Sequence, residues 1–263
     1  MTALALTLSD SRTMLRRNLK RAVRYPGLTV IVAAMPIVFL LLFVYVFGGT
    51  LGAGLGAPSG GRAEYLAYVV PGILVLAMTG GAQGTAIGIA MDMTEGIIAR
   101  FRTMSIARAA VLTGHVIGAV VQTMVGLALV LAVALLVGFR PSADALEWLA
   151  VIGVLAMTGF ALSWLSVAMG LHTKTVEAAS NLPMPLMLLP FFGSGFVPVD
   201  SMPAGLRWFA EHQPFTPLIE TLRGLLTGTA IGSSGLLSIG WCAAIALVGY
   251  VWARRNYERR PAR

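Results

Sequence analysis

The sequence contains very little charge: only 11% of its 263 residues are Asp, Glu, Lys or Arg, whereas 57% are hydrophobic. A soluble globular protein carries about 25% charged residues, because its surface needs polar groups in water. The composition therefore excludes a soluble globular domain, and its apolar content excludes an intrinsically disordered chain. A single cysteine, Cys242, excludes a disulfide-stabilised scaffold. The class that remains is a membrane protein that crosses the bilayer several times.

Motifs of enzyme active sites are also absent. The three histidines, His115, His172 and His212, do not have the spacing of a zinc site. Neither lysine follows the glycine of a GxxxxGK[ST] nucleotide-binding loop, so this route to ATP hydrolysis is excluded. We therefore expect this chain to be no enzyme and to hold no metal or cofactor. The central parts of its apolar stretches also contain no carboxylate of the kind that ion-coupled carriers use.

Six apolar stretches are each long enough to cross about 30 Å of hydrocarbon at about 1.5 Å per residue. They show no period-two alternation, so we predict an all-α membrane protein with six transmembrane helices, because helices satisfy their own backbone in lipid. The predicted spans are Leu28–Phe47, Tyr65–Met91, Val111–Val137, Trp148–Leu171, Ala178–Val197 and Leu236–Ala253.

The basic residues are divided unequally between the two sides of these spans. Fifteen of the 19 Lys and Arg residues lie in the segments 1–27, 92–110, 172–177 and 254–263. The other four are Arg62, Arg140, Arg207 and Arg223. Because basic loops stay in the cytoplasm, we expect both termini to be cytoplasmic in a bacterial plasma membrane. Membrane orientation also explains the basic excess better than nucleic acid does, so we expect no nucleic-acid partner.

The N-terminal segment 1–27 is predicted to form a cytoplasmic amphipathic helix. Leu15, Leu19 and Val23 recur at i, i+4 and i+8 among basic residues, a pattern typical of a helix in the headgroup layer. We expect lipid phosphate to be bound by Arg16, Arg17, Lys20 and Arg21. A solvated segment that only fixes the topology is the alternative.

The segment 92–110 is the longest cytoplasmic loop between spans. Its acidic residues, Asp92 and Glu95, precede its basic ones, an order that favours a short helix. The loop has an apolar face of Ile97, Ile98, Phe101 and Met104. Such a face needs a partner protein or a membrane surface, or it packs on the bundle itself.

The segments around the fifth span are unusual. Pro183, Pro185 and Pro190 lie within it, and each proline removes a helix hydrogen bond, so we expect kinks that serve packing or motion. In the following segment, 198–235, helix-start signals precede apolar helices too short to span. We predict an outer helical hairpin that lies at the surface or re-enters the membrane. The transmembrane domain then covers residues 28–253, followed by a cytoplasmic tail, 254–263.

Two stretches of the sequence carry a family resemblance. They are YVVPGILVLAMTGGAQGTAIGIAMDMTEGIIARFRTMSIARAAVLTGH and LPFFGSGFVPVDSMPAGLRWFAEHQPFTPLIETLRGLLTG. With them, essentially the whole chain resembles the permease subunit of ABC type-2 exporters, in the branch of daunorubicin/doxorubicin-resistance permeases. The pattern F-V-P-V-x-x-M-P followed by P-x-T-P is fairly specific to this branch. The chain departs from many relatives at Ser105, where they have proline.

The resemblance implies a half-transporter in which two permease subunits, identical or related, assemble with two ATPase subunits that hold ATP and magnesium. It implies an amphiphilic substrate, such as a drug, an antibiotic or a (glyco)lipid, and docking of the 92–110 loop on the ATPase. The expected coupling residues are Asp92, Glu95, Gly96, Ile97, Arg100, Phe101 and Arg102. By residue type, we expect the substrate path to include Met35, Phe39, Met78, Gln83, Met187 and Phe191.

Two other functions stay open at this point. An ion-coupled secondary efflux carrier is the alternative, and a membrane enzyme or assembly factor is a more remote one. A neighbouring gene with a nucleotide-binding loop favours the exporter, whereas transport by the permease alone under an ion gradient favours the carrier. Activity on a lipid headgroup without transport favours the enzyme.

Overall fold

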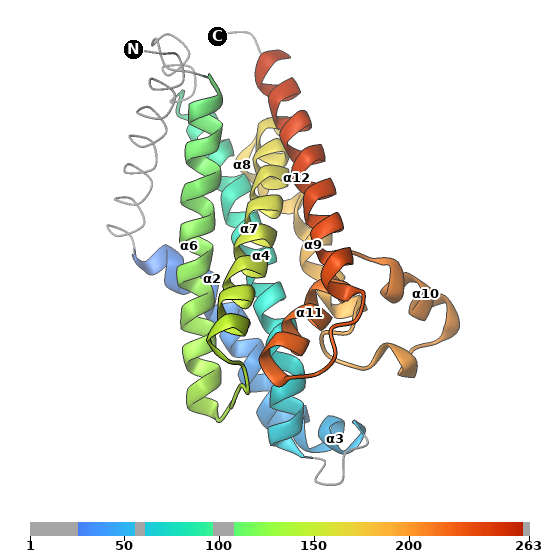
Figure 1. The fold of residues 1–263 in the computed structure, drawn as a ribbon. Helices are drawn as coiled ribbons and strands as arrows, with labels where there is room; N and C mark the ends of the chain where they lie inside the picture. The colour runs from blue at the N-terminus through green and yellow to red at the C-terminus, as the bar shows by residue number, and fades with distance from the viewer. Residues whose placement is uncertain (1–25, 56–60, 97–107, 260–263) are drawn as a thin grey trace.

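The computed structural model describes residues 26–55, 61–96 and 108–259, and all regular elements in these ranges are helices (Figure 1). In chain order they are α2 (Pro26–Leu42), the π-helix η1 (Phe43–Phe47), α3 (Gly48–Ala53), α4 (Arg62–Thr94), α6 (Arg108–Val137), α7 (Ala145–His172), α8 (Val176–Asn181), α9 (Met184–Leu188), the 3-10 helices η2 (Leu189–Phe192) and η3 (Val199–Ser201), α10 (Ala204–His212), α11 (Phe215–Thr227) and α12 (Ser234–Arg259). The predicted all-α membrane fold is confirmed.

Five helical segments of the described residues are long and apolar enough to cross a membrane. They are Ala33–Ala53, Arg62–Thr94, Leu112–Val137, Ala145–His172 and Ser234–Glu258. They correspond to the first four predicted spans and the sixth.

The predicted fifth span, Ala178–Val197, is not one helix. It is divided into α8, α9, η2 and a turn, which we call the broken segment (residues 176–197). Pro185 and Pro190 stand at the starts of α9 and η2, where a missing backbone N–H costs no helical hydrogen bond. The prolines therefore end one short helix and begin the next instead of only kinking a long one.

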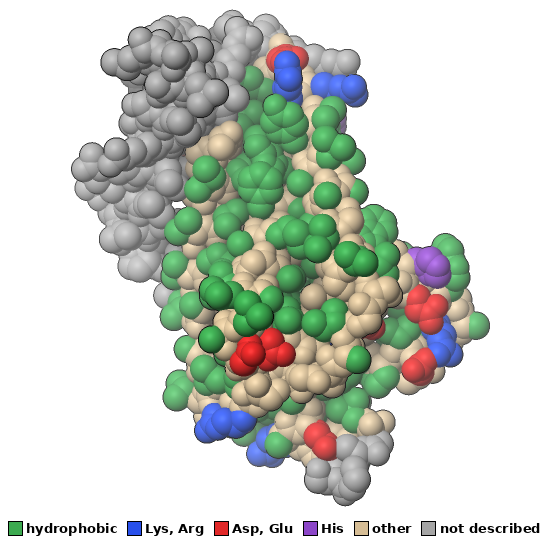
Figure 2. Space-filling model, in the orientation of Figure 1, with side chains coloured by type: hydrophobic (Ala, Val, Ile, Leu, Met, Phe, Trp, Pro, Cys, Tyr) green, Lys and Arg blue, Asp and Glu red, His purple; other side chains and the backbone are tan. Residues whose placement is uncertain are grey.

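Helix α4 is the centre of the bundle. In its most apolar stretch 78% of the residues are buried, compared with 22% in the corresponding stretches of α6 and α12. It packs against α2, α6, α7, α8 and α11, while α7 and α12 lie side by side (Figure 1). Hydrophobic side chains cover much of the visible face, and charged ones gather toward its ends and on α10 (Figure 2). An apolar outer surface of this kind is stable only in contact with lipid or another protein.

Helix α4 extends past its predicted end. Its last turn contains Asp92, and it stops where Gly96 takes a left-handed φ of 70° that suits glycine. The N–H groups of Glu95 and Gly96 bond back to Met91 and Met93. Asp92 therefore belongs to the bundle and not to the loop in which the sequence placed it.

The expected short helices of segment 198–235 are present. Helix α11 ends at Gly228, which has a φ of 71°. It is largely buried and contacts α4, α7 and α12, whereas α10 projects from the bundle (Figure 1). The N–H of Ser142 donates to the carbonyl of Leu226 at 3.0 Å, which joins the α6–α7 connection to α11.

Candidate functional site

The broken segment receives hydrogen bonds from side chains of other elements. Where a helix is interrupted, its carbonyls lose their donors, and the bilayer core offers no water to replace them. Gln83 of α4 donates through Nε2 to the carbonyl of Ser180 at 2.7 Å. Gln213, just before α11, donates through Nε2 to the carbonyl of Leu189 at 3.3 Å. These amides supply donors that a continuous helix would have provided from its own backbone.

Arg223 of α11 joins three parts of the chain. Its guanidinium donates to the carbonyls of Ser194, in the turn after η2, and of Tyr68, in α4, the latter at 3.2 Å. It also lies 3.8 Å from the centre of the Tyr68 ring, a cation–π distance. Burial lowers the pKa of the guanidinium, and Tyr68 and Glu220 oppose this shift. The Glu220 carboxylate itself accepts a hydrogen bond from Ser234 at 2.9 Å.

The turn after η2 packs directly on the backbone of α4. The hydroxyl of Tyr65 donates to the carbonyl of Phe196 at 3.1 Å. A Cβ added at Gly72 would lie 2.6 Å from the carbonyl oxygen of Gly195, so only glycine fits this close approach. The broken segment is thus held against the central helix by donors from both α4 and α11.

A row of phenylalanines joins the broken segment to α2 and η1. The rings of Phe39 and Phe191 are 5.7 Å apart, and those of Phe43 and Phe196 are 4.6 Å apart. Phe191 and Phe196 are themselves stacked at 4.6 Å. Such contacts add to the stabilisation that comes from burial alone. The π-helix η1 lies within this row, and single π-helical turns often mark functional sites.

The same elements expose large hydrophobic side chains. They are Met35, Val38, Leu42, Tyr45 and Val46 on α2 and η1, and Met184, Leu188 and Phe192 on α9 and η2, and we refer to these eight together as the α2–α9 face. Apolar side chains of this size are exposed where a chain contacts protein, lipid or an amphiphilic ligand.

The residues predicted to line a substrate path do not all come together. Phe39 and Phe191 are in contact, and Met35 lies on the α2–α9 face. Gln83 uses its amide to bind the broken segment. Met78 is only 1% exposed and lies inside the core, where its methyl carbon would be 3.7 Å from a Cβ added at Gly159. Met187, in α9, is half-buried.

A second polar contact lies where α4 ends and α6 begins. His115 Nε2 is 3.1 Å from Asp92 Oδ2, and these side chains are 12% and 1% exposed. Sequence reasoning assigned Asp92 to coupling but gave no role to His115. Of the other predicted coupling residues, Glu95 is exposed and Gly96 ends the helix, whereas Ile97, Arg100, Phe101 and Arg102 lie outside the described residues. The predicted phosphate-binding residues Arg16, Arg17, Lys20 and Arg21 also lie outside them.

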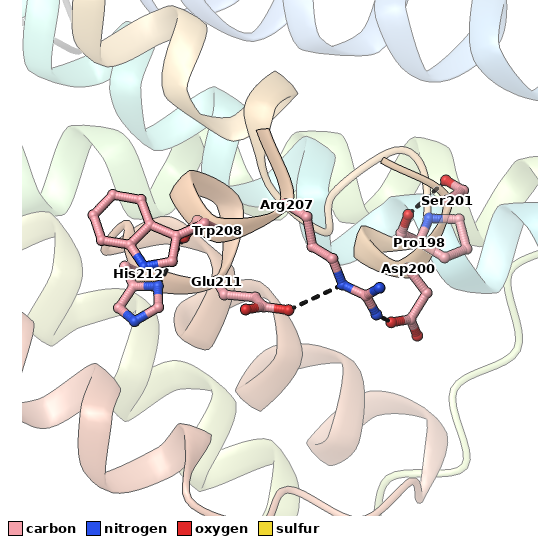
Figure 3. A network of polar contacts seen from close by, with 7 residues as sticks. All are labelled: Pro198, Asp200, Ser201, Arg207, Trp208, Glu211 and His212. Carbon is pink, nitrogen blue, oxygen red and sulfur yellow. Dashed lines mark hydrogen bonds and ion pairs between the residues drawn. The ribbon is translucent and has the colours of Figure 1, made fainter. Parts of the chain in front are cut away.

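The projecting α10 carries a local polar network. Arg207 lies between the carboxylates of Asp200 and Glu211, and the ring of Trp208 stacks on His212 at 4.8 Å (Figure 3). Exposed ion pairs of this kind contribute little to stability. The two ion pairs and the ring contact lie within η3 and α10.

Comparisons with known proteins agree with one another. Residues 10–227 match the family model of the ABC-2 type transporter. The chain is 30% identical over 230 residues to the daunorubicin resistance ABC transporter permease protein DrrB1 of Streptomyces coeruleorubidus, covering 87% of this chain and 78% of that protein. It is 27% identical over 225 residues to the probable doxorubicin resistance ABC transporter permease protein DrrC of Mycobacterium tuberculosis, covering 86% and 79%.

Proposed function

The chain belongs to the ABC-2 type transporter family, and from this premise we propose that it is the permease subunit of an ATP-driven exporter of amphiphilic drugs, antibiotics or (glyco)lipids. The relatives described above are permeases named for resistance to daunorubicin and doxorubicin, which are amphiphiles with a flat aromatic part. ATP and magnesium would be held by a separate ATPase subunit, two copies of which would join two permease subunits, identical or related.

One observation supports this proposal most directly, namely that the elements which carry the row of phenylalanines also expose the eight apolar side chains of the α2–α9 face. Eight exposed apolar side chains there offer methionine and aromatic contacts that adapt to ligands of varied shape. Two such faces, one from each permease of a pair, would form an apolar route between subunits. Four carbonyls of the broken segment already have donors, from Gln83, Gln213, Arg223 and Tyr65, so these four need none from the substrate.

The proposal is tested in proteoliposomes that contain the permease with its ATPase, using doxorubicin as a fluorescent probe. We expect doxorubicin to accumulate on the side of the membrane opposite the ATPase only when ATP and both subunits are present. An ATPase variant without its nucleotide-binding lysine serves as the control. Transport by the permease alone under a proton or sodium gradient would establish the carrier instead. Turnover of a lipid headgroup without transport would establish an enzyme.

The proposed orientation places both termini in the cytoplasm of a bacterium. Cysteine substitutions at Ser59, Ala143 and Ser201 should then react with an impermeant reagent applied from outside, after Cys242 has been replaced. Substitutions at Ser9 or Ala262 should react only after the membrane is opened. Labelling of either terminus in intact cells would contradict this topology.

A further inference from the structure

A carboxylate and a histidine lie buried together at one end of the bundle. Asp92 is in the last turn of α4, and His115 is two turns into α6, with 3.1 Å between Oδ2 and Nε2. The chain between the two helices belongs to the segment 92–110 that is predicted to dock on the ATPase, which we call the coupling loop. The Asp92–His115 pair therefore connects the helix that enters this loop to the helix that leaves it.

A buried apolar cluster lies within one helical turn of the pair. Ile89 of α4 and Leu112 and Val116 of α6 belong to a buried cluster that also includes residues of α7 and α12. Four helices thus meet beside the pair. A carboxylate placed in such surroundings is costly unless it is hydrogen-bonded, and ionisable residues in membrane helices mark functional positions more often than packing positions. Apolar side chains would have joined α4 to α6 at lower cost, because they need no partner.

We propose that the Asp92–His115 pair positions α4 and α6 relative to the coupling loop, so that a displacement of the loop by the ATPase moves both helices together. The proposal rests on the proposed function, since it needs an ATPase that acts on this loop. Without the pair, the loop moves while the two helices separate, and ATP is hydrolysed without export. A bond that only stabilises the fold would instead lower ATP hydrolysis and export in equal proportion.

The experiment measures the ATP hydrolysed per doxorubicin exported by the reconstituted complex. His115→Phe removes the polar contact to Asp92 and should raise this ratio at least about fivefold, the lower end of typical coupling between sites. His115→Gln retains an N–H donor at the end of the side chain and should stay near the wild-type ratio. Ser166→Ala is the matched control, because this buried hydroxyl donates only within α7, to the carbonyl of Leu162 at 2.8 Å.

Three outcomes decide the proposal. A raised ratio for His115→Phe, with rescue by His115→Gln, supports it. Equal losses of hydrolysis and export in His115→Phe, or an unchanged ratio, overturn it. Should His115→Phe not insert into the membrane, Asp92→Leu decides the question, because it keeps the approximate shape of the side chain but removes the acceptor, and an unchanged ratio in that variant overturns the proposal. A wild-type complex that exports no doxorubicin on addition of ATP overturns the proposed function itself, and with it the premise of this inference.

Discussion

Helix α4 and the broken segment are both apolar and both contain proline, yet their backbone carbonyls obtain hydrogen-bond donors in different ways. Helix α4 remains helical over 33 residues although Pro71 interrupts its hydrogen bonds once. The broken segment has Pro183, Pro185 and Pro190, and it divides into short helices. Of the four side chains described above that donate to its carbonyls from other elements, Tyr65 and Gln83 come from α4 itself. A membrane segment can therefore depart from a continuous helix where a neighbouring helix supplies the missing donors.

The strongest test of this comparison is the loss of Arg223. In Arg223→Gln, the carbonyls of Ser194 and Tyr68 lose a charged donor and the Tyr68 ring loses its cation. We expect the free energy of unfolding to fall by about 3 kcal/mol, measured by thermal and denaturant unfolding in detergent. Arg223→Lys keeps the charge but not the planar fork of donors, so it should recover only part of the loss. Wild-type stability in Arg223→Gln would contradict the assigned role.

The close approach of the turn to α4 gives the next largest effect. Alanine at Gly72 would place its Cβ 2.6 Å from the carbonyl oxygen of Gly195, so Gly72→Ala should lower stability by about 2 kcal/mol through overpacking. Gly84→Ala is the control in the same helix, because nothing lies within 4 Å of its Cβ. It should be neutral or stabilising by up to about 1 kcal/mol. Equal unfolding temperatures for the two variants would show that the turn does not touch α4.

Gln83 allows the structural and transport roles of one side chain to be separated. Gln83→Leu removes the donor to the carbonyl of Ser180, so stability should fall by about 1 kcal/mol. Export of several amphiphiles by the reconstituted complex is measured alongside unfolding. A uniform small decrease for all substrates agrees with a positioning role. A selective loss for one amphiphile, with unchanged stability, would place Gln83 on the substrate path instead.

The smallest effect is expected at Tyr65. Tyr65→Phe removes the hydroxyl that donates to the carbonyl of Phe196 but keeps the buried ring, so the loss should be below about 1 kcal/mol. The exposed Tyr45 provides the control, since Tyr45→Phe keeps the ring that faces the Arg62 guanidinium at 4.9 Å. A shift in unfolding temperature for Tyr65→Phe alone is the expected result. Equal shifts in unfolding temperature for the two variants would contradict the hydrogen bond from Tyr65 to the broken segment.

The length and hydropathy of the apolar stretches predicted the long helices well. They could not predict how the fifth stretch divides, because hydropathy counts apolar side chains and contains no information on which carbonyls find donors. The three prolines were visible in the sequence and indicated kinks, and Ala178–Val197 still has the composition of a span. The extent of the break depends on contacts from α4 and α11 that only the folded chain brings together.

The residues of the site were predictable in part. Phe39 and Phe191 were selected by residue type, and the structure places their rings in contact. Arg223 entered the prediction only through the distribution of charge, because one of its acceptors, Tyr68, lies 155 residues away in sequence. His115 had no assigned role, since nothing in the spacing of the chain pairs it with Asp92. Contacts over such distances follow from packing, and no local pattern records them.

The donor from α11 to the broken segment also has a consequence for biosynthesis. Arg223 follows its acceptor, Ser194, by 29 residues. A ribosome that adds about 5–20 residues per second makes the acceptor a few seconds before the donor. During that interval, Gln83 and Tyr65 of α4 have already been synthesised and can donate to the broken segment. Until Arg223 is made, the carbonyl of Ser194 lacks its donor from α11, and variants of Arg223 should prolong the exposure of the fifth stretch to membrane quality control.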